Sequence, residues 1–184
     1  MTSIALLGAG GKMGCRIIDH IKDSRAYSLR CVETSERGRA QLEQRSLRSI
    51  PQGEAIVDAD VVILALPDRL LGQVAATVVP AVKKNCMVIT LDPAAAHAGE
   101  LPDRDDISYF ITHPCHPSVF DHFETQKERD DFFGGTHARH AIVCALMQGP
   151  EAHYALGEQI ARDIYAPVTR AHRITVEQMG IGVK

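Results

Sequence analysis

A glycine-rich turn near the N-terminus constrains the fold of this chain more than any other feature. Residues 8–14 read Gly-Ala-Gly-Gly-Lys-Met-Gly, after an apolar run at residues 3–7 and before apolar residues at helical spacing over residues 12–21. This order predicts a strand, a tight turn and a helix. Such a turn is typical of dinucleotide-binding domains, because glycine lets the backbone approach a diphosphate while the helix N-terminus offers N–H groups and a positive dipole.

The glycines of this turn have separate expected roles. Gly8 would permit the tight turn, Gly10 or Gly11 would let the backbone approach the pyrophosphate, and Gly14 would let the helix pack closely on the sheet. The pattern is not a strict G-x-G-x-x-G, since Met13 stands in the third glycine position and Gly14 follows one residue later. The expected cofactor contacts in the turn are Gly8, Gly10, Gly11, Lys12, Met13 and Gly14.

A carboxylate follows the turn at the distance that such domains require. Glu33 ends a predicted second strand, about 20 residues after the turn, where it would accept hydrogen bonds from the adenosine ribose. A carboxylate there repels the 2′-phosphate of NADP and so favours NAD. Ser35, Arg37 and Arg39 leave NADP open as the alternative, because they could bind that phosphate if Glu33 turned away.

Strands and helices alternate along the rest of the chain. Apolar runs at residues 60–67 and 86–91 show no alternation, which is typical of strands buried on both faces of a parallel sheet. Further strands are expected at residues 108–112, 139–147 and 167–175, and helices at residues 37–47, after residue 68, and over residues 150–165. The expected fold is therefore α/β, a Rossmann-type doubly wound, mostly parallel sheet with helices on both faces.

Three of the predicted strand ends carry distinctive residues, and ligands of open parallel sheets bind beyond such ends. Leu66, Pro67 and Asp68 close one strand and are expected to contact the cofactor. Asp68 either caps the next helix or lies near the nicotinamide ribose. The small residues of segment 92–97 would let a nicotinamide ring or a substrate approach.

The third strand end reads Thr-His-Pro-Cys-His-Pro over residues 112–117. We expect His113 and His116 to be catalytic, because a histidine can take the hydroxyl proton as hydride leaves the same carbon. Two alternatives stay open: metal ligation by His113, Cys115 and His116, with His122 as a further ligand, or histidines with structural contacts only. Residues 113–140 form a long irregular connection, in which residues 124–131 are expected to be a solvated helix face.

Composition excludes several classes of protein. The 184 residues are 45% hydrophobic and 23% charged, with a net charge of -3 and no Trp, so a nucleic-acid partner has no support. No apolar run approaches the ~18 residues of a membrane span. The five cysteines form no C-x-x-C pair, which indicates neither a disulfide framework nor a zinc site. We expect a reduced, cytoplasmic protein.

The glycine turn, residues 65–68, residues 92–96 and residues 112–117 together resemble the N-terminal half of the phosphogluconate dehydrogenase-like group that includes D-apionate oxidoisomerase. More distantly they are similar to ketol-acid reductoisomerase and prephenate dehydrogenase. The resemblance implies NAD-dependent oxidation of a branched sugar acid, coupled to a rearrangement of its carbon skeleton. It also implies cofactor contacts at the turn and at Glu33, and places His113 and His116 near the substrate.

The resemblance further implies a C-terminal helical domain that completes the substrate site and builds a homodimer. We therefore expect residues 1–176 to be the NAD(P)-binding domain and residues 177–184 to be a truncated tail or the start of a missing helical domain, with an exposed apolar docking surface. The expected function is that of an NAD-dependent oxidoreductase acting on a hydroxy or sugar acid. A simple hydroxyacid dehydrogenase, or an NAD(P)-binding module or nucleotide sensor without turnover, are the alternatives, and participation of a divalent cation stays open.

Overall fold

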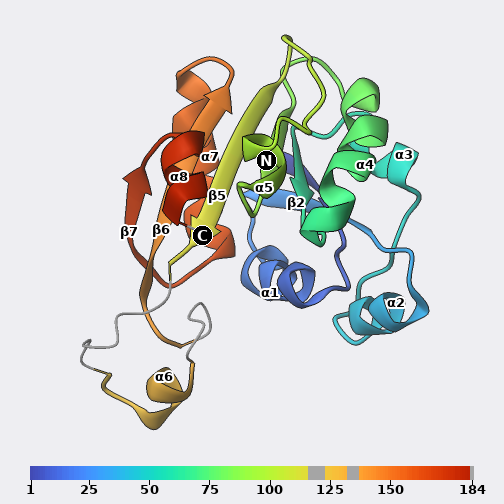
Figure 1. The fold of residues 1–184 in the computed structure, drawn as a ribbon. Helices are drawn as coiled ribbons and strands as arrows, with labels where there is room; N and C mark the ends of the chain where they lie inside the picture. The colour runs from blue at the N-terminus through green and yellow to red at the C-terminus, as the bar shows by residue number, and fades with distance from the viewer. Residues whose placement is uncertain (116–122, 132–136, 183–184) are drawn as a thin grey trace.

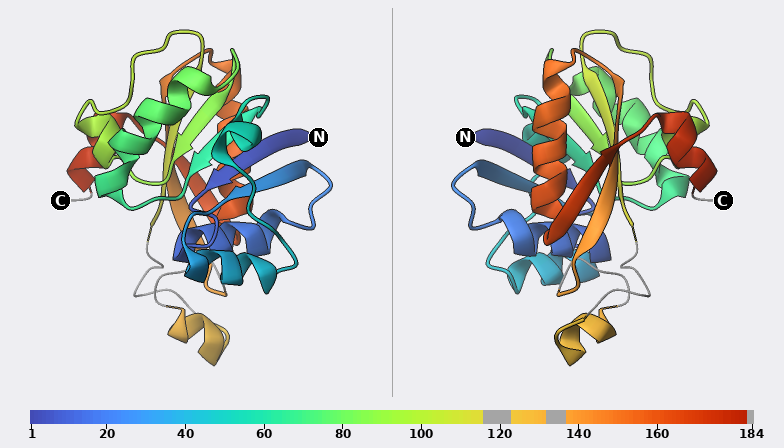
Figure 2. Two further views of the ribbon diagram at one scale, coloured as in Figure 1. Left: turned by 90° about the vertical axis from the view of Figure 1, so that its right-hand side faces the viewer. Right: turned by 90° about the vertical axis from the view of Figure 1, so that its left-hand side faces the viewer.

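The computed structural model describes residues 1–115, 123–131 and 137–182. Within them, strands and helices alternate to build a sheet of seven strands covered by helices on both faces (Figures 1 and 2). The strands are β1 (Thr2–Leu7), β2 (Tyr27–Val32), β3 (Val61–Leu64), β4 (Met87–Thr90), β5 (Ser108–Pro114), β6 (His140–Gln148) and β7 (Val168–Arg173). The helices are α1 (Lys12–Ile21), α2 (Glu36–Glu43), α3 (Gln52–Ile56), α4 (Asp68–Val78), η1 (Val79–Ala81), α5 (Ala94–His97), α6 (Gln126–Asp130), α7 (Ala152–Ile164) and α8 (Val176–Gly182).

The order of the strands confirms the expected doubly wound α/β fold. The sheet runs β2-β1-β3-β4-β5-β6-β7, and the first five strands are parallel to one another. β6 then pairs antiparallel to β5, and β7 pairs parallel to β6, so the last two strands run against the others. The carboxyl ends of β1 to β5 consequently meet along one edge, which is where such sheets bind their ligands.

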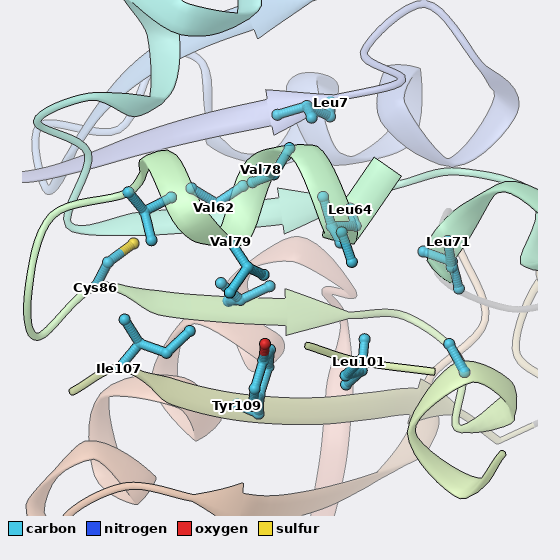
Figure 3. Close-up of a cluster of buried hydrophobic side chains, with 14 of the residues drawn as sticks. Leu7, Val62, Leu64, Leu71, Val78, Val79, Cys86, Leu101, Ile107 and Tyr109 are labelled. Carbon is cyan, nitrogen blue, oxygen red and sulfur yellow. The ribbon is translucent and has the colours of Figure 1, made fainter. Parts of the chain in front are cut away.

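Successive side chains of β1 point to opposite faces of the sheet, and each face packs into its own hydrophobic core. Ala5 and Leu7 face a core shared with α3, α4, α5 and α8. Ile4 and Leu6 face the opposite core, shared with α1, α2 and α7. Because both faces of the strand are covered, each of these side chains is at most 2% exposed, and an apolar run without alternation results. Figure 3 shows the first core, in which Leu7 of β1 is paired in register with Leu64 of β3.

Several element ends differ from the sequence-based expectation. The helix expected at residues 37–47 is α2, which ends earlier, at Glu43; a short bridge between Ser49 and Cys31 of β2 follows, and α3, which was not expected, comes after it. The strand expected at residues 60–67 stops at Leu64 as β3. The polar composition of α2 explains the first difference, because only Gly38 and Leu42 of that helix are buried and little packing extends it.

The C-terminal segment is a packed helix, although its glycines gave no clear helical signal. α8 contacts α5 and β6, and Met179 is 2% exposed. A Cβ on Gly180 would stand 2.8 Å from Nδ1 of His97, so a glycine lets the helix approach α5 at this point. Segment 177–182 therefore contributes to the core beside the sheet (Figure 2).

Residues 123–131 carry α6, which lies apart from the sheet (Figures 1 and 2). Thr125 and Glu128 form a reciprocal capping box at its start, and none of its residues is buried. The solvated charged helix expected for residues 124–131 is therefore confirmed. No helix in the described ranges is long and apolar enough to cross a membrane.

Candidate active site

The glycine turn between β1 and α1 is shaped by backbone contacts that no side chain could tolerate. Gly8 has φ +76°, and a Cβ there would stand 2.3 Å from the carbonyl oxygen of Ala65. A Cβ on Gly14 would stand 2.3 Å from the carbonyl oxygen of Gly8 and 2.6 Å from the backbone of Ala9. The expected roles of Gly8 in the turn and of Gly14 in close packing of the helix are both confirmed.

Gly10 lies against the start of α2. A Cβ on Gly10 would stand 2.3 Å from Cα of Gly38, so its missing side chain admits the backbone of that helix. The nearest atom to a Cβ on Gly11 is the carbonyl oxygen of Gly8, at 3.2 Å. Of the two glycines, Gly11 is the one whose neighbourhood leaves room for a ligand.

The backbone amides of the turn divide into two groups. Gly8 and Ala9 donate to the carbonyl of Val32 at the end of β2, and Gly11 donates back to Gly8. At the start of α1, no hydrogen bond of the Met13 or Gly14 amide occurs within the described residues. The first turn of α1 contains no acidic residue and no side-chain cap. A helix N-terminus of this kind attracts an anion, because N–H groups and the helix dipole face it together.

An open cleft of about 880 Å³ lies over this helix start. It extends from Glu33 and Ser35 on one side to Leu66 and Pro67 on the other. The glycine turn and cationic side chains complete the lining, with Gly8, Gly10, Gly11, Lys12, Arg16, Arg37 and Arg45 among its residues. The cleft is large enough for part of a dinucleotide, and its size class is that of small-molecule sites in proteins.

Glu33 directly follows β2 and points its carboxylate at the turn. Its Oε2 accepts a hydrogen bond from the amide of Gly10 at 3.0 Å. Its Oε1 accepts from the amides of Thr34 (2.9 Å) and Ser35 (2.8 Å) and from the hydroxyl of Ser35 (2.9 Å). Burial acts to raise the pKa of Glu33, but the hydrogen bonds from Ser35, Gly10 and Thr34 outweigh it and hold that pKa below its ordinary value.

The residues that could bind a 2′-phosphate are mostly engaged in other contacts. Arg39 donates to the carbonyl oxygens of Glu33 and Thr34, and the hydroxyl of Ser35 caps α2. Arg37 lines the cleft and is exposed. Glu33 is turned toward the turn rather than away from it, which is the arrangement that the NAD expectation requires.

Asp68 does not cap a helix, so that expectation is wrong. Pro67 occupies the cap position of α4, Asp68 is the first helical residue, and no side-chain cap bond forms. Desolvation raises the pKa of Asp68, and the charge of Asp92 raises it further while that of His113 acts against both. The three side chains, which come from the ends of β3, β4 and β5, are therefore within electrostatic range of one another.

His113 lies near the end of β5 with a defined orientation. Its Nδ1 lies 2.9 Å from the carbonyl oxygen of Leu91 and 3.7 Å from Oδ2 of Asp92. A carbonyl oxygen can only accept, so Nδ1 carries the hydrogen and the neutral ring has its lone pair on Nε2. Oδ1 of Asp92 is held by the amide of Ala94 at 2.8 Å. A histidine with a free lone pair and a carboxylate behind it is suited to take up a proton.

Asp92 is the functional candidate that sequence reasoning missed. In the sequence it stands only at the start of a segment of small residues, 92–97. The available signal was its position directly beyond a buried strand, next to another strand end that carries a histidine. Sequence spacing does not give the distance between Asp92 and His113, which are brought together by pairing of β4 with β5.

The metal alternative finds no support among the residues that the structure describes. Within them no group of three His, Cys, Asp or Glu side chains is placed to hold a metal ion. His116 and His122 lie outside the described residues, so the catalytic role expected for His116 has no structural account. Burial raises the pKa of the Cys115 thiol, and all five cysteines are free.

Comparison with known proteins gives relatives over nearly the whole chain. The chain is 52% identical over 182 residues to D-apionate oxidoisomerase of Rhizobium rhizogenes, covering 98% of this chain and 66% of that protein. It is 46% identical over 179 residues to the enzyme of the same name from Cupriavidus necator, covering 97% and 64%. This chain thus spans just under two thirds of the length of these curated relatives.

Solved structures agree with these relatives. A semialdehyde dehydrogenase NAD-binding protein from Cupriavidus necator, in complex with calcium and NAD, superposes with a TM-score of 0.94 at 46% identity, covering 98% of this chain and 66% of that one. An NADH-preferring ketol-acid reductoisomerase from an uncultured archaeon shares the fold, with a TM-score of 0.79 at 17% identity over 99% of this chain and 54% of its own. Residues 121–182 match a family model described as phosphogluconate dehydrogenase (decarboxylating) C-term.

Proposed function

This chain belongs to the phosphogluconate dehydrogenase-like family that includes the D-apionate oxidoisomerases, and from that premise we propose that it is the cofactor-binding part of an NAD-dependent oxidoreductase acting on a hydroxy or sugar acid. The observation that carries the proposal is the cleft over α1. The start of α1, with no acidic residue in its first turn, and the carboxylate of Glu33 lie at the same cleft, as the diphosphate and ribose sites of a dinucleotide do.

The turn and the start of α1 would hold the diphosphate. Met13 and Gly14 would donate their backbone amides, and Lys12 would add positive charge in the same cleft. Glu33 would accept a hydrogen bond from the adenosine ribose. Leu66 and Pro67 would line the path toward the ends of β3, β4 and β5, with Asp68 beside the nicotinamide ribose. When bound, the nicotinamide supplies the hydride acceptor.

We propose NAD as the cofactor in preference to NADP. The carboxylate of Glu33 is fixed by four hydrogen bonds and carries its charge where a 2′-phosphate would lie. Two negative charges in contact cost several kcal/mol at the effective dielectric of a protein surface, about 4 kcal/mol for unit charges 4 Å apart. NADP binding requires Glu33 to break these bonds or accept that repulsion.

We propose His113 as the proton acceptor for the substrate hydroxyl. Nε2 of His113 would take the hydroxyl proton of the substrate, while a bound nicotinamide would supply the acceptor for the hydride of the same carbon, which would become a carbonyl. The charge that appears on the ring is stabilised by Asp92 at 3.7 Å and by the carbonyl of Leu91 at 2.9 Å. His116 is proposed as a further substrate contact from its position in the sequence.

The names of the relatives make a branched sugar acid, D-apionate, the proposed substrate, with oxidation coupled to rearrangement of the carbon skeleton. The relative solved with calcium and NAD gives a reason to include a divalent cation in the assay. We propose residues 1–176 as the cofactor-binding domain, with α8 packed against its α5 and β6, and a cytoplasmic location. A homodimer is also proposed, because Met147 on β6 and Ile181 on the contacting α8 are 43% and 71% exposed.

A two-stage experiment tests the function. Thermal shift with NAD, NADH, NADP and NADPH reports binding, since a hundredfold excess over the dissociation constant raises the apparent stability by ~2.7 kcal/mol. Absorbance of the reduced cofactor is then followed with D-apionate, with calcium, with magnesium and with chelator. Reduction with a rearranged product supports the oxidoisomerase, and reduction without rearrangement supports a simple dehydrogenase. Cofactor binding without reduction supports a cofactor-binding module without turnover. If none of the four cofactors raises the melting temperature, the proposal is wrong.

A further inference from the structure

The hydroxyl of Ser35 joins the candidate ribose carboxylate to the start of α2. Its oxygen accepts a hydrogen bond from the amide of Gly38 at 3.0 Å, which caps the helix. Its hydrogen is donated to Oε1 of Glu33, at 2.9 Å. The amide of the same residue donates to the same Oε1, at 2.8 Å. One serine thus uses a donor and an acceptor of its hydroxyl to fix Glu33 relative to a helix.

These contacts leave only one oxygen of Glu33 with capacity for a ligand. Oε1 accepts three hydrogen bonds, from the amides of Thr34 and Ser35 and from the hydroxyl of Ser35. Oε2 accepts one, from the amide of Gly10. A carboxylate oxygen has about two lone-pair sites, so Oε1 is saturated and Oε2 retains one. The remaining acceptor is therefore on the oxygen that also binds the glycine turn.

Packing removes the alternative positions of the carboxylate on its other side. A Cβ on Gly38 would stand 2.3 Å from Cδ of Glu33, so the carboxylate lies directly against the first turn of α2. A helix start also stabilises a negative charge placed there. The charge of Glu33 is therefore held by the turn, by its own loop and by α2 together.

We propose that Ser35 is a positioning residue that sets the choice between NAD and NADP, by holding the negative charge of Glu33 against the ribose. This inference rests on the proposed function and deepens it. Without the Ser35 hydroxyl, Oε1 loses a donor and the carboxylate can rotate away from the ribose. Arg37, which lines the same cleft and makes no ion pair within the described ranges, would then face a 2′-phosphate without a competing anion.

The test measures dissociation constants for NADH and NADPH in the full chain. Ser35→Ala removes both hydroxyl bonds, Ser35→Thr keeps a hydroxyl, and Thr175→Ala removes a comparable helix cap at α8, where Thr175 accepts from the amide of Gln178. We expect the wild type to prefer NADH and Ser35→Ala to narrow that preference about tenfold, as expected when two like charges move several ångströms apart. Ser35→Thr should restore the preference, and Thr175→Ala should leave it unchanged.

If loss of the cap in Ser35→Ala unfolds α2, a second variant still tests the inference. Gly38→Ala retains the cap, but its Cβ would collide with Cδ of Glu33 and displace the carboxylate. It should narrow the NADH preference in the same direction. If Ser35→Ala and Gly38→Ala weaken both cofactors by the same factor, or leave the preference intact, the inference is overturned while the proposed function stands. If the wild type binds neither NADH nor NADPH, the proposed function is wrong, and so is the inference about Ser35.

Discussion

The carbonyl oxygen of Gly8 lies 2.3 Å from the place where a Cβ on Gly14 would stand. The start of α1 is thereby held against the end of β1 with no room for a side chain. This contact brings the amides at the start of α1 to the edge of the sheet, beside the cleft that Glu33 also lines. The candidate site therefore depends on a packing distance between two glycines.

Gly14→Ala should destabilise the fold and remove cofactor binding together. The new methyl would meet backbone atoms of Gly8 and Ala9, which cannot rotate away as a side chain can. Overpacking of this kind costs about 1–3 kcal/mol or more. Gly53→Ala is the matched control, because a Cβ on Gly53 meets nothing within 4 Å, and it should be neutral or slightly stabilising. Urea unfolding measures the free energy of unfolding of the two variants. Equal stability of Gly14→Ala and Gly53→Ala would contradict the packing argument.

Asp92→Asn should lower turnover about tenfold and leave NADH binding nearly unchanged. Asparagine keeps the oxygen that accepts from the amide of Ala94, so the local backbone is retained while the charge near His113 is lost. His113→Asn should lower turnover by about 10²-fold or more, as for other general bases. Asp106→Asn, whose carboxylate pairs with Arg104, serves as a control with wild-type turnover. Steady-state kinetics measure the turnover of the three variants. Wild-type turnover in His113→Asn would exclude His113 as the proton acceptor.

His140→Leu should remove part of the acid sensitivity of the fold. His140 is 3% exposed, and within the described residues neither ring nitrogen makes a hydrogen bond of good geometry. Desolvation lowers the pKa of His140 in the folded protein; the backbone of Ala138 and the charge of Asp131 act against this, and the charges of Arg16 and His20 act with it. The unfolded chain, with a histidine pKa of about 6.5, then binds more protons than the folded one, so the free energy of unfolding falls as the pH falls through that value.

The leucine variant keeps the volume and has no proton to gain. It should be more stable than the wild type by about 1 kcal/mol at pH 7, because two unsatisfied polar atoms are gone. The difference should widen at pH 5.5. Thermal unfolding between pH 5.5 and pH 8 measures this, and parallel pH profiles for the two proteins would refute the assignment to His140.

Gly157→Ala should disrupt the packing of α7 on β5. A Cβ on Gly157 would stand 2.4 Å from Cδ2 of Phe110, a fully buried ring that also contacts Tyr154. The single variant should lose about 1–3 kcal/mol of stability. Adding Phe110→Leu should recover part of that loss, because the smaller side chain vacates the space that the methyl needs. A double-mutant cycle gives the coupling, and strictly additive losses would show that the two positions do not compete for space.

Much of the cofactor end of the site follows from local sequence. The turn at residues 8–14 predicted its own strand and helix because periodicity and glycine sterics act over a few residues. Glu33 followed from its distance along the chain, and His113 from its place after a buried run. Element ends were less accurate: residues 65–67 continue the apolar pattern of β3 but lie outside the strand.

The sequence by itself determined the alternation of buried strands and helices and the glycine turn, since each depends on residues close together in the chain. It also indicated Glu33, the acid that faces the turn, by its distance from the turn along the chain. Tertiary structure alone decided that β6 and β7 run against the other strands, that α8 packs on α5, that Gly10 meets Gly38, and that Asp92 stands behind His113. Each of these contacts joins residues from different elements. Their distances are fixed by which strands pair and how helices pack across them, and no local pattern carries that information.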